Sequence, residues 1–130
     1  MPGDNASTVA PGTDVAFPND GVKTDGNISR VSPSLFTVAE KGAYLVQFQV
    51  SVTEAGQLCL ALDNVEQPFT VVGRATGTST LSGSFLIDVK EDNTLISVRN
   101  PASETTALTI TPLAGGTNPV SAHLLILRVA

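Results

Sequence analysis

Residues 42–52, GAYLVQFQVSV, alternate between apolar and weakly polar side chains, and this pattern constrains the fold more than any other feature of the chain. A strand with this period of two residues has one wholly apolar face, made of Tyr44, Val46, Phe48, Val50 and Val52. The other face carries no charge and is made of Ala43, Leu45, Gln47, Gln49 and Ser51. We therefore expect both faces to be covered, one by the chain's own core and the other by a further layer, most simply a second copy of the chain.

Further segments of β character recur at intervals of roughly 8 to 12 residues, the spacing typical of a β-sandwich or barrel. They lie at residues 15–17, 27–30, 34–38, 57–63, 69–74, 79–89, 95–99, 107–111 and 122–129. No stretch carries an apolar stripe with the 3.6-residue period of a helix. The sequence predicts an all-β fold, an antiparallel jelly-roll β-sandwich that closes by associating with other copies.

The length of 130 residues predicts one domain with one core. Residues 1–13 mix Pro, Gly, Ser, Thr, Asn and Asp without periodicity, so we predict a flexible N-terminal lead-in there and the folded domain over residues 14–130. The lead-in lacks the basic and apolar regions of a secretory signal, and no run reaches the roughly 20 apolar residues of a membrane span. We expect no membrane span, and either no secretion by that route or a fragment of a longer protein.

The charge pattern excludes one class of partner and leaves room for another. Charged residues make up only 15% of the chain, below the roughly 25% of average soluble domains, which leaves surface for burial against protein partners. The net charge is −5, and the seven basic residues are scattered singly. Because no Lys/Arg stripe could neutralise phosphates, nucleic acid is not an expected ligand.

Candidate catalytic and metal-binding residues are few. Cys59 has no partner for an intrachain disulfide, so we expect a reduced, buried thiol on the face of its strand opposite Leu58, Leu60 and Leu62. His123, the single histidine, lies on an apolar strand without a nucleophile motif nearby, so we predict no catalytic site and no cofactor. Oxygen ligands for calcium could come from two acidic turns, which contain Asp20, Asp25, Asp88, Glu91 and Asp92. Their spacing matches no calcium loop, and we predict no metal site.

Three local features, in this order along the chain, carry a resemblance to a known family. They are Gly42-Ala43-Tyr44 at the start of a strand, the turn Asp63-Asn64-Val65, and a terminal apolar strand that ends in Val129-Ala130. From about Val15 to its end the chain resembles the tumour necrosis factor and complement-type globular heads. Within that superfamily it is most similar to the C-terminal heads of collagen-like glycoproteins on the outermost layer of Bacillus and clostridial spores.

The resemblance implies a homotrimeric jelly roll carried at the end of a Gly-x-y triple-helical stalk, on the spore exosporium or another extracellular surface. This chain contains no Gly-x-y repeat, so the stalk either is left out of this sequence or never existed, and we expect an excised head domain. The implied role is structural: the domain trimerises, sets the register of the stalk and forms the distal knob of a filament. Two alternatives stay open, namely recognition of a host or matrix ligand and the tip of a phage or viral fibre.

The strands that are apolar on both faces also predict which side chains meet in the trimer. We expect Tyr44, Val46 and Phe48 to face the core together with Leu125 and Leu127. The predicted subunit contact then consists of the side chains on the opposite faces: Leu45, Gln47, Leu86, Leu124 and Ile126.

Overall fold

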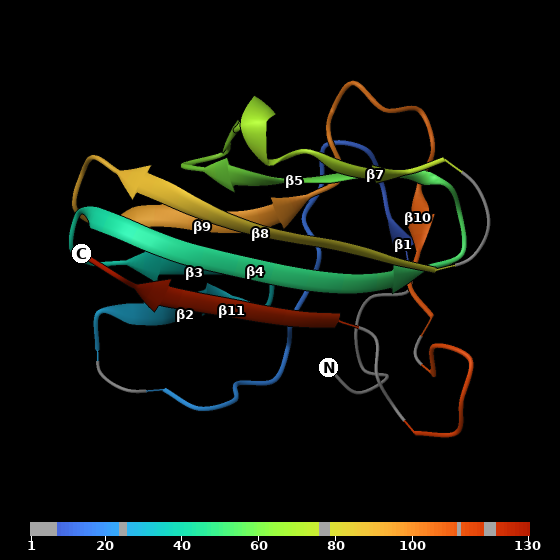
Figure 1. Cartoon of the computed structure of the whole chain (residues 1–130), viewed down its shortest axis with the longest axis horizontal. Helices are drawn as coiled ribbons and strands as arrows, with labels where there is room; N and C mark the ends of the chain where they lie inside the picture. The colour runs from blue at the N-terminus through green and yellow to red at the C-terminus, as the bar shows by residue number, and fades with distance from the viewer. Residues whose placement is uncertain (1–7, 24–25, 76–78, 112, 119–121) are drawn as a thin grey trace.

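The computed structural model describes residues 8–23, 26–75, 79–111, 113–118 and 122–130 (Figure 1). The strands are β1 (Thr8–Val9), β2 (Ile28–Ser32), β3 (Leu35–Val38), β4 (Gly42–Val52), β5 (Gly56–Leu62), β6 (Val65–Glu66), β7 (Val72–Arg74), β8 (Ser79–Val89), β9 (Thr94–Arg99), β10 (Leu108–Thr109) and β11 (Ala122–Arg128). A short 3-10 helix, η1 (Pro68–Thr70), is the one other regular element among these residues. The prediction of an all-β chain is confirmed.

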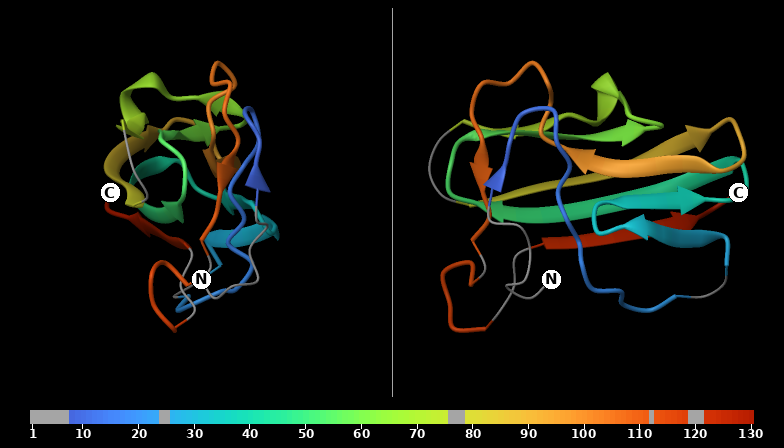
Figure 2. Two further views of the ribbon diagram at one scale, coloured as in Figure 1. Left: turned by 90° about the vertical axis from the view of Figure 1, so that its right-hand side faces the viewer. Right: turned by 180° about the vertical axis from the view of Figure 1, so that it is seen from behind.

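Two antiparallel sheets form a sandwich, which Figure 2 shows from one end and from behind. The front sheet has the strand order β11-β4-β8, and every residue of β4 is in register with one of β8. The back sheet has the order β2-β3-β9-β5-β6, and β7 pairs with the first residues of β5. A small third sheet pairs β1 with β10. This arrangement confirms the predicted antiparallel jelly roll.

The core lies between the two sheets and contains the apolar face of β4 as expected. Tyr44, Val46 and Phe48 are at most 2% exposed, and the back sheet meets them with buried side chains. Those of β5 and β9 are Leu58, Leu60, Ile96 and Val98. Period-two alternation is sufficient here because one face of β4 is wholly apolar, whereas the other mixes Leu45 with amide and hydroxyl side chains.

The predicted faces of β11 are wrong. Leu124 and Ile126 pack against the core, because β11 pairs with β4 in the register Leu124 to Phe48 and Ile126 to Val46. Leu125 and Leu127 face outward and are nearly half exposed. Both faces of this strand are apolar, so alternation alone does not choose between them, and a shift of one residue in the register exchanges them.

The predicted boundary at residue 13 is also wrong, because residues 8–13 belong to the folded domain. Val9 is buried in the core, and β1 pairs with β10. The Asn100 side chain fastens this segment, since its Nδ2 donates to the Val9 carbonyl at 3.0 Å. The Asn100 carbonyl also accepts the Gly12 N–H at 2.7 Å. These contacts are long-range, and local composition carries no sign of them. Residues 1–7 lie outside the described residues.

Candidate subunit interface

The outward side of the front sheet, here called the front face, carries a row of three leucines across its strands. Leu127 on β11 is in register with Leu45 on β4, which is in register with Leu86 on β8. Side chains directly opposite each other on neighbouring strands lie about 4.5 to 5.5 Å apart at Cβ. Leu86 is 66% exposed and Leu127 is 48% exposed, while Leu45 between them is half-buried. Three adjacent leucines thus form a continuous apolar strip open to solvent.

Further along the same strands the front face becomes polar without becoming charged. The next outward row is Leu125, Gln47 and Ser84, and the one after it is His123, Gln49 and Ser82. The Gln47 amide donates to the Ser84 hydroxyl at 3.0 Å. These residues line an open hollow of about 660 Å³. Covering this side of the sheet would therefore bury leucine, amide and hydroxyl groups rather than charges.

Charged groups gather at one end of the front sheet and pair there. The Arg128 guanidinium contacts a Glu40 carboxylate oxygen and donates to the Lys41 carbonyl at 3.1 Å. Asp88 lies 3.4 Å from the Lys90 ammonium. Charged residues are depleted at the centre of protein interfaces, because desolvating a charge costs several kcal/mol. The composition of the front face is that of a surface suited to burial.

The predicted contact residues divide into two groups. Leu45, Gln47 and Leu86 lie on the front face as expected, whereas Leu124 and Ile126 lie behind it. Sequence reasoning placed Leu125 and Leu127 in the core, whereas both lie on the front face. Arg128 lies on the same face of the strand as Ile126, so its charge favours an outward Ile126. Arg128 is at the strand end, however, where its long side chain reaches Glu40 and Lys41. The polar His123, which shares its face with Leu125 and Leu127, is the signal that could have identified the outward side.

The Gly42-Ala43-Tyr44 motif fixes the end of β11 on β4. A Cβ atom at Gly42 would lie 2.6 Å from the Ala130 carbonyl oxygen, so only glycine permits this close approach. The Ala43 backbone accepts the Val129 N–H at 2.8 Å and donates to the Ala130 carbonyl at 3.2 Å. The Tyr44 ring is fully buried, and its hydroxyl accepts from Asn27 and donates to the Glu40 carbonyl.

The Asp63-Asn64 turn is a two-residue hairpin loop between β5 and β6. Both residues have positive φ angles, 49° and 65°, as a type I′ turn requires. The Asp63 carboxylate accepts the Leu95 N–H at 2.9 Å, and Arg99 donates to both oxygens of Asn64. Asp and Asn tolerate this backbone conformation better than most residues, so the turn forms without the Gly that often follows Asn there.

Cys59 is buried on the outer side of the back sheet, as predicted, opposite its leucine neighbours. Desolvation, assisted by the nearby Glu66 carboxylate, raises the pKa of the thiol to about 11. A thiol with such a pKa is protonated at neutral pH and is therefore a poor nucleophile. His123 lies on the opposite sheet, so the two residues do not meet.

The acidic turns are held by protein contacts. Asp92 accepts the Lys41 N–H at 2.9 Å, and Asp20 pairs with Arg30. Asp25 lies outside the described residues. Over the described ranges, no group of three or more His, Cys, Asp or Glu side chains is arranged to hold a metal ion.

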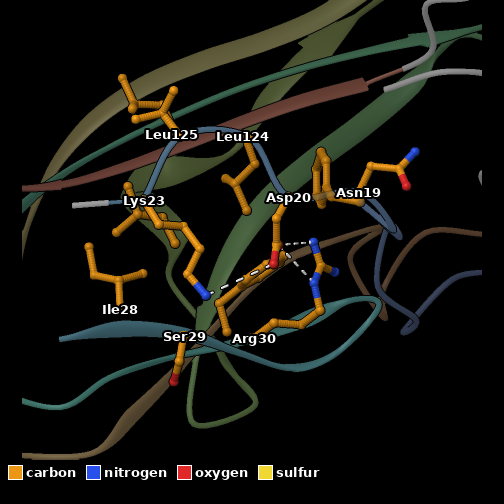
Figure 3. Close-up of a pocket in the computed structure, with 13 residues that line it drawn as sticks. Asn19, Asp20, Lys23, Ile28, Ser29, Arg30, Leu124 and Leu125 are labelled. Carbon is orange, nitrogen blue, oxygen red and sulfur yellow. Dashed lines mark hydrogen bonds and ion pairs between the residues drawn. The ribbon is translucent and has the colours of Figure 1, made fainter. Parts of the chain in front are cut away.

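A second hollow, of about 140 Å³, lies at the edge of the sandwich between β2, β11 and residues 17–23 (Figure 3). The Asp20 carboxylate accepts from Arg30 Nη2 and Nε at 2.6 and 2.9 Å, and this hydrogen bonding lowers the pKa of Asp20. The guanidinium of Arg30 also lies 4.9 Å from the centre of the Phe36 ring. These contacts tie residues 17–23 to β2 and close this edge of the sandwich.

The two antiparallel sheets and the pairing of their strands define a jelly-roll β-sandwich domain. The chain belongs to the family of BclA C-terminal domains, whose model matches residues 3–130. This family consists of structural head domains of collagen-like exosporium proteins. A search of curated proteins finds no match to the chain. Among the described residues, no helix has the length and hydropathy needed to cross a membrane.

Proposed function

We propose that this chain is a non-catalytic trimerising head, which joins the collagen-like segments of three chains into one triple-helical stalk on the surface of a bacterial spore. The observation that carries the proposal is the strip of exposed leucines on the front face, Leu45, Leu86 and Leu127, with Leu125 beside it. Exposed apolar surface of this continuity is typical of protein interaction sites. Membership of the BclA C-terminal family supports the stalk and the exosporium location.

The energetics favour burial of the front face. Transferring a leucine side chain from water to an apolar contact contributes roughly 1.5 to 3 kcal/mol. In a ring of three chains each such contribution occurs three times, which helps to offset the entropy lost on association. No charge has to be desolvated along the rows from Leu127 to His123. A collagen triple helix contains three chains, which favours three-fold over two-fold symmetry.

The alternatives named from the resemblance, a module for host or matrix ligands and the tip of a phage or viral fibre, stay predictions. Both would use the same trimer, so neither competes with the proposed assembly. A ligand-recognition role would have to be established by binding measurements on the trimer.

The test places a Gly-Pro-Pro repeat segment upstream of the chain and follows its triple helix by circular dichroism. We expect the wild-type head to make refolding of the melted triple helix independent of protein concentration, since the head keeps three chains together. Leu127→Asp should abolish this effect, because it places a carboxylate in the apolar strip.

The matched control is Val22→Asp, which introduces the same carboxylate at a valine that is 98% exposed and off the front face. Val22→Asp should refold like wild type. Refolding of the wild-type fusion at the concentration-dependent rate of the bare repeat would refute the trimerising role. If Leu127→Asp refolds like wild type, the front face is not the interface.

A further inference from the structure

The segment from Val65 to Val71 displays three apolar side chains to solvent. It lies at the β6 edge of the back sheet, outside the front face. Val65 is 62% exposed, Phe69 is 61% exposed and Val71 is 39% exposed. The segment contains β6 and η1 and leads into β7. In Figure 1 it includes the yellow-green turn that projects at the top, above β5 and β7. It is the densest group of exposed large apolar residues outside the front face among the described residues.

Several hydrogen bonds hold this segment in a fixed conformation. Thr70 is fully buried, and its hydroxyl accepts the Leu60 N–H at 2.8 Å and donates to the Gln67 carbonyl at 2.7 Å. The Gln67 N–H donates to the Leu60 carbonyl at 2.9 Å. Pro68 begins the helical turn and restricts its backbone. Because Thr70 is fastened inward, Phe69 and Val71 on either side of it are kept at the surface.

A rigidly held, exposed phenylalanine is a favourable interface residue. Its ring offers a large apolar area, and a fixed backbone has little further entropy to lose on binding. Like the rows of the front face from Leu127 to His123, the segment carries little charge. Glu66 is its only charged residue, and one carboxylate oxygen of Glu66 accepts the Ala102 N–H at 2.9 Å.

Symmetry requires a second surface of this kind if the chain forms a three-fold ring. In a closed ring each interface is heterologous: one patch of a subunit meets a different patch of the next. A front face that is covered as a whole by one neighbour supplies one of these two patches. The other must be reachable from the edge of the sandwich, and segment 65–71 leads into β7, which contacts β8 at the edge of the front sheet.

Other exposed apolar residues fit this requirement less well. Val31 lies on β2, at the irregular register between Arg30 and Ser32. Val22 lies in the loop beside the Asp20 and Lys23 ion pair. Each is a single side chain beside charged neighbours, whereas segment 65–71 offers three apolar side chains.

We propose that segment 65–71 of one subunit packs against the front face of the next, with Phe69 as its anchor. The occupant of the front face is therefore a second copy of the chain, through a surface different from the front face itself. This inference rests on the proposed trimer, and it specifies which surfaces form the contact.

The first test compares wild type, Phe69→Ala and Val31→Ala by light scattering behind size exclusion over a dilution series. Phe69→Ala removes the ring without adding a charge, and its exposed position leaves the fold intact. We expect the concentration at which half of the chains are assembled to rise at least tenfold in Phe69→Ala and to stay unchanged in Val31→Ala. A trimeric wild type with an unaffected Phe69→Ala would overturn this inference and leave the trimer standing. A monomeric wild type would overturn both.

The second test mixes two chains that each lack one surface. Phe69→Asp keeps its front face, and Leu127→Asp keeps its segment 65–71, so each alone should be monomeric. Their mixture retains one intact contact and should form a one-to-one heterodimer that grows no further. Absence of the heterodimer from the mixture, or trimers in Phe69→Asp alone, would show that front faces do not pair with segment 65–71.

Discussion

The outer sides of the two sheets differ in how they are covered. On the back sheet Cys59 and Ala61 point away from the core, and yet both are fully buried by the chain itself. On the front sheet Leu86 and Leu127 also point away from the core, and they are largely exposed. Both sheets therefore contain strands with two apolar faces, but only the back sheet covers its second face within one chain.

Polar side chains cover the outer side of the back sheet above the buried Cys59. Arg99 is in register with Cys59, and its guanidinium pairs with Asp14 at 2.9 Å and with both oxygens of Asn64. The ion pair is only 12% and 14% exposed. The front face has no comparable group across its leucine row. The comparison teaches that a strand with two apolar faces indicates burial of both faces. Segments distant in the sequence decide whether the second face is covered by the same chain.

The largest expected effect on folding comes from placing a carboxylate on the outer side of each sheet in turn. Ala61→Asp introduces an unpaired charge at a fully buried site, so we expect loss of folding, beyond about 4 kcal/mol. Leu127→Asp should leave a folded monomer, since that side chain is uncovered within the chain. Far-ultraviolet circular dichroism with urea unfolding separates the two results. A folded Ala61→Asp protein would contradict the full burial of Ala61 on the back sheet.

Removing the polar cover itself should have the next largest effect. Arg99→Ala deprives Asp14 of its partner in a mostly buried position and frees both oxygens of Asn64, so we expect a loss of about 3 kcal/mol of unfolding free energy. Urea unfolding measures it. The matched control is Arg128→Ala, whose ion pair with Glu40 is exposed and should contribute less than about 1 kcal/mol. Equal losses in both variants would remove the contrast between buried and exposed pairs.

The buried thiol predicts a pH dependence for the back sheet. The pKa of Cys59 is raised from 9.0 to about 11, so the folded state retains its proton more strongly than the unfolded chain does. This contribution is complete below pH 9 and is lost between pH 9 and about 11, and it amounts to at most about 3 kcal/mol. Urea unfolding across this range should give a steeper decline for wild type than for Cys59→Ala. Identical slopes would contradict the raised pKa.

The smallest effect is expected at the front face of an isolated chain. Leu86→Ser in the Leu127→Asp background should change the unfolding free energy by less than about 0.5 kcal/mol, as is usual for exposed positions. In the otherwise wild-type chain the same substitution should weaken assembly. A large loss in the monomeric background would mean that Leu86 is covered within its own chain.

Local alternation predicted those parts of the fold that depend on one strand at a time. It identified β4, β8 and the face of β5 that carries Cys59 correctly, because the two faces of each strand differ clearly. It assigned β11 wrongly, since Leu124 and Leu125 are equally apolar and only the register with Phe48 decides between them.

Non-local contacts account for the other differences. Residues 8–13 fold because Asn100 and β10 hold them, and the extended strand expected at residues 69–74 instead begins with η1 at Pro68. Leu45, Gln47 and Leu86 stay predicted interface residues, joined now by Leu125 and Leu127. Segment 65–71 had no distinct signal in the sequence, since exposure of Phe69 follows from the hydrogen bonds of Thr70 to Leu60 and Gln67.

The mass of the wild-type chain in solution tests most directly whether the front face is a subunit interface. Native mass spectrometry at micromolar concentration gives this mass without any substitution. We predict a species of about 40 kDa, three times the 13.4 kDa of one chain. A single species at 13.4 kDa that persists as the concentration is raised would contradict the account, because the front face would then be left uncovered in solution.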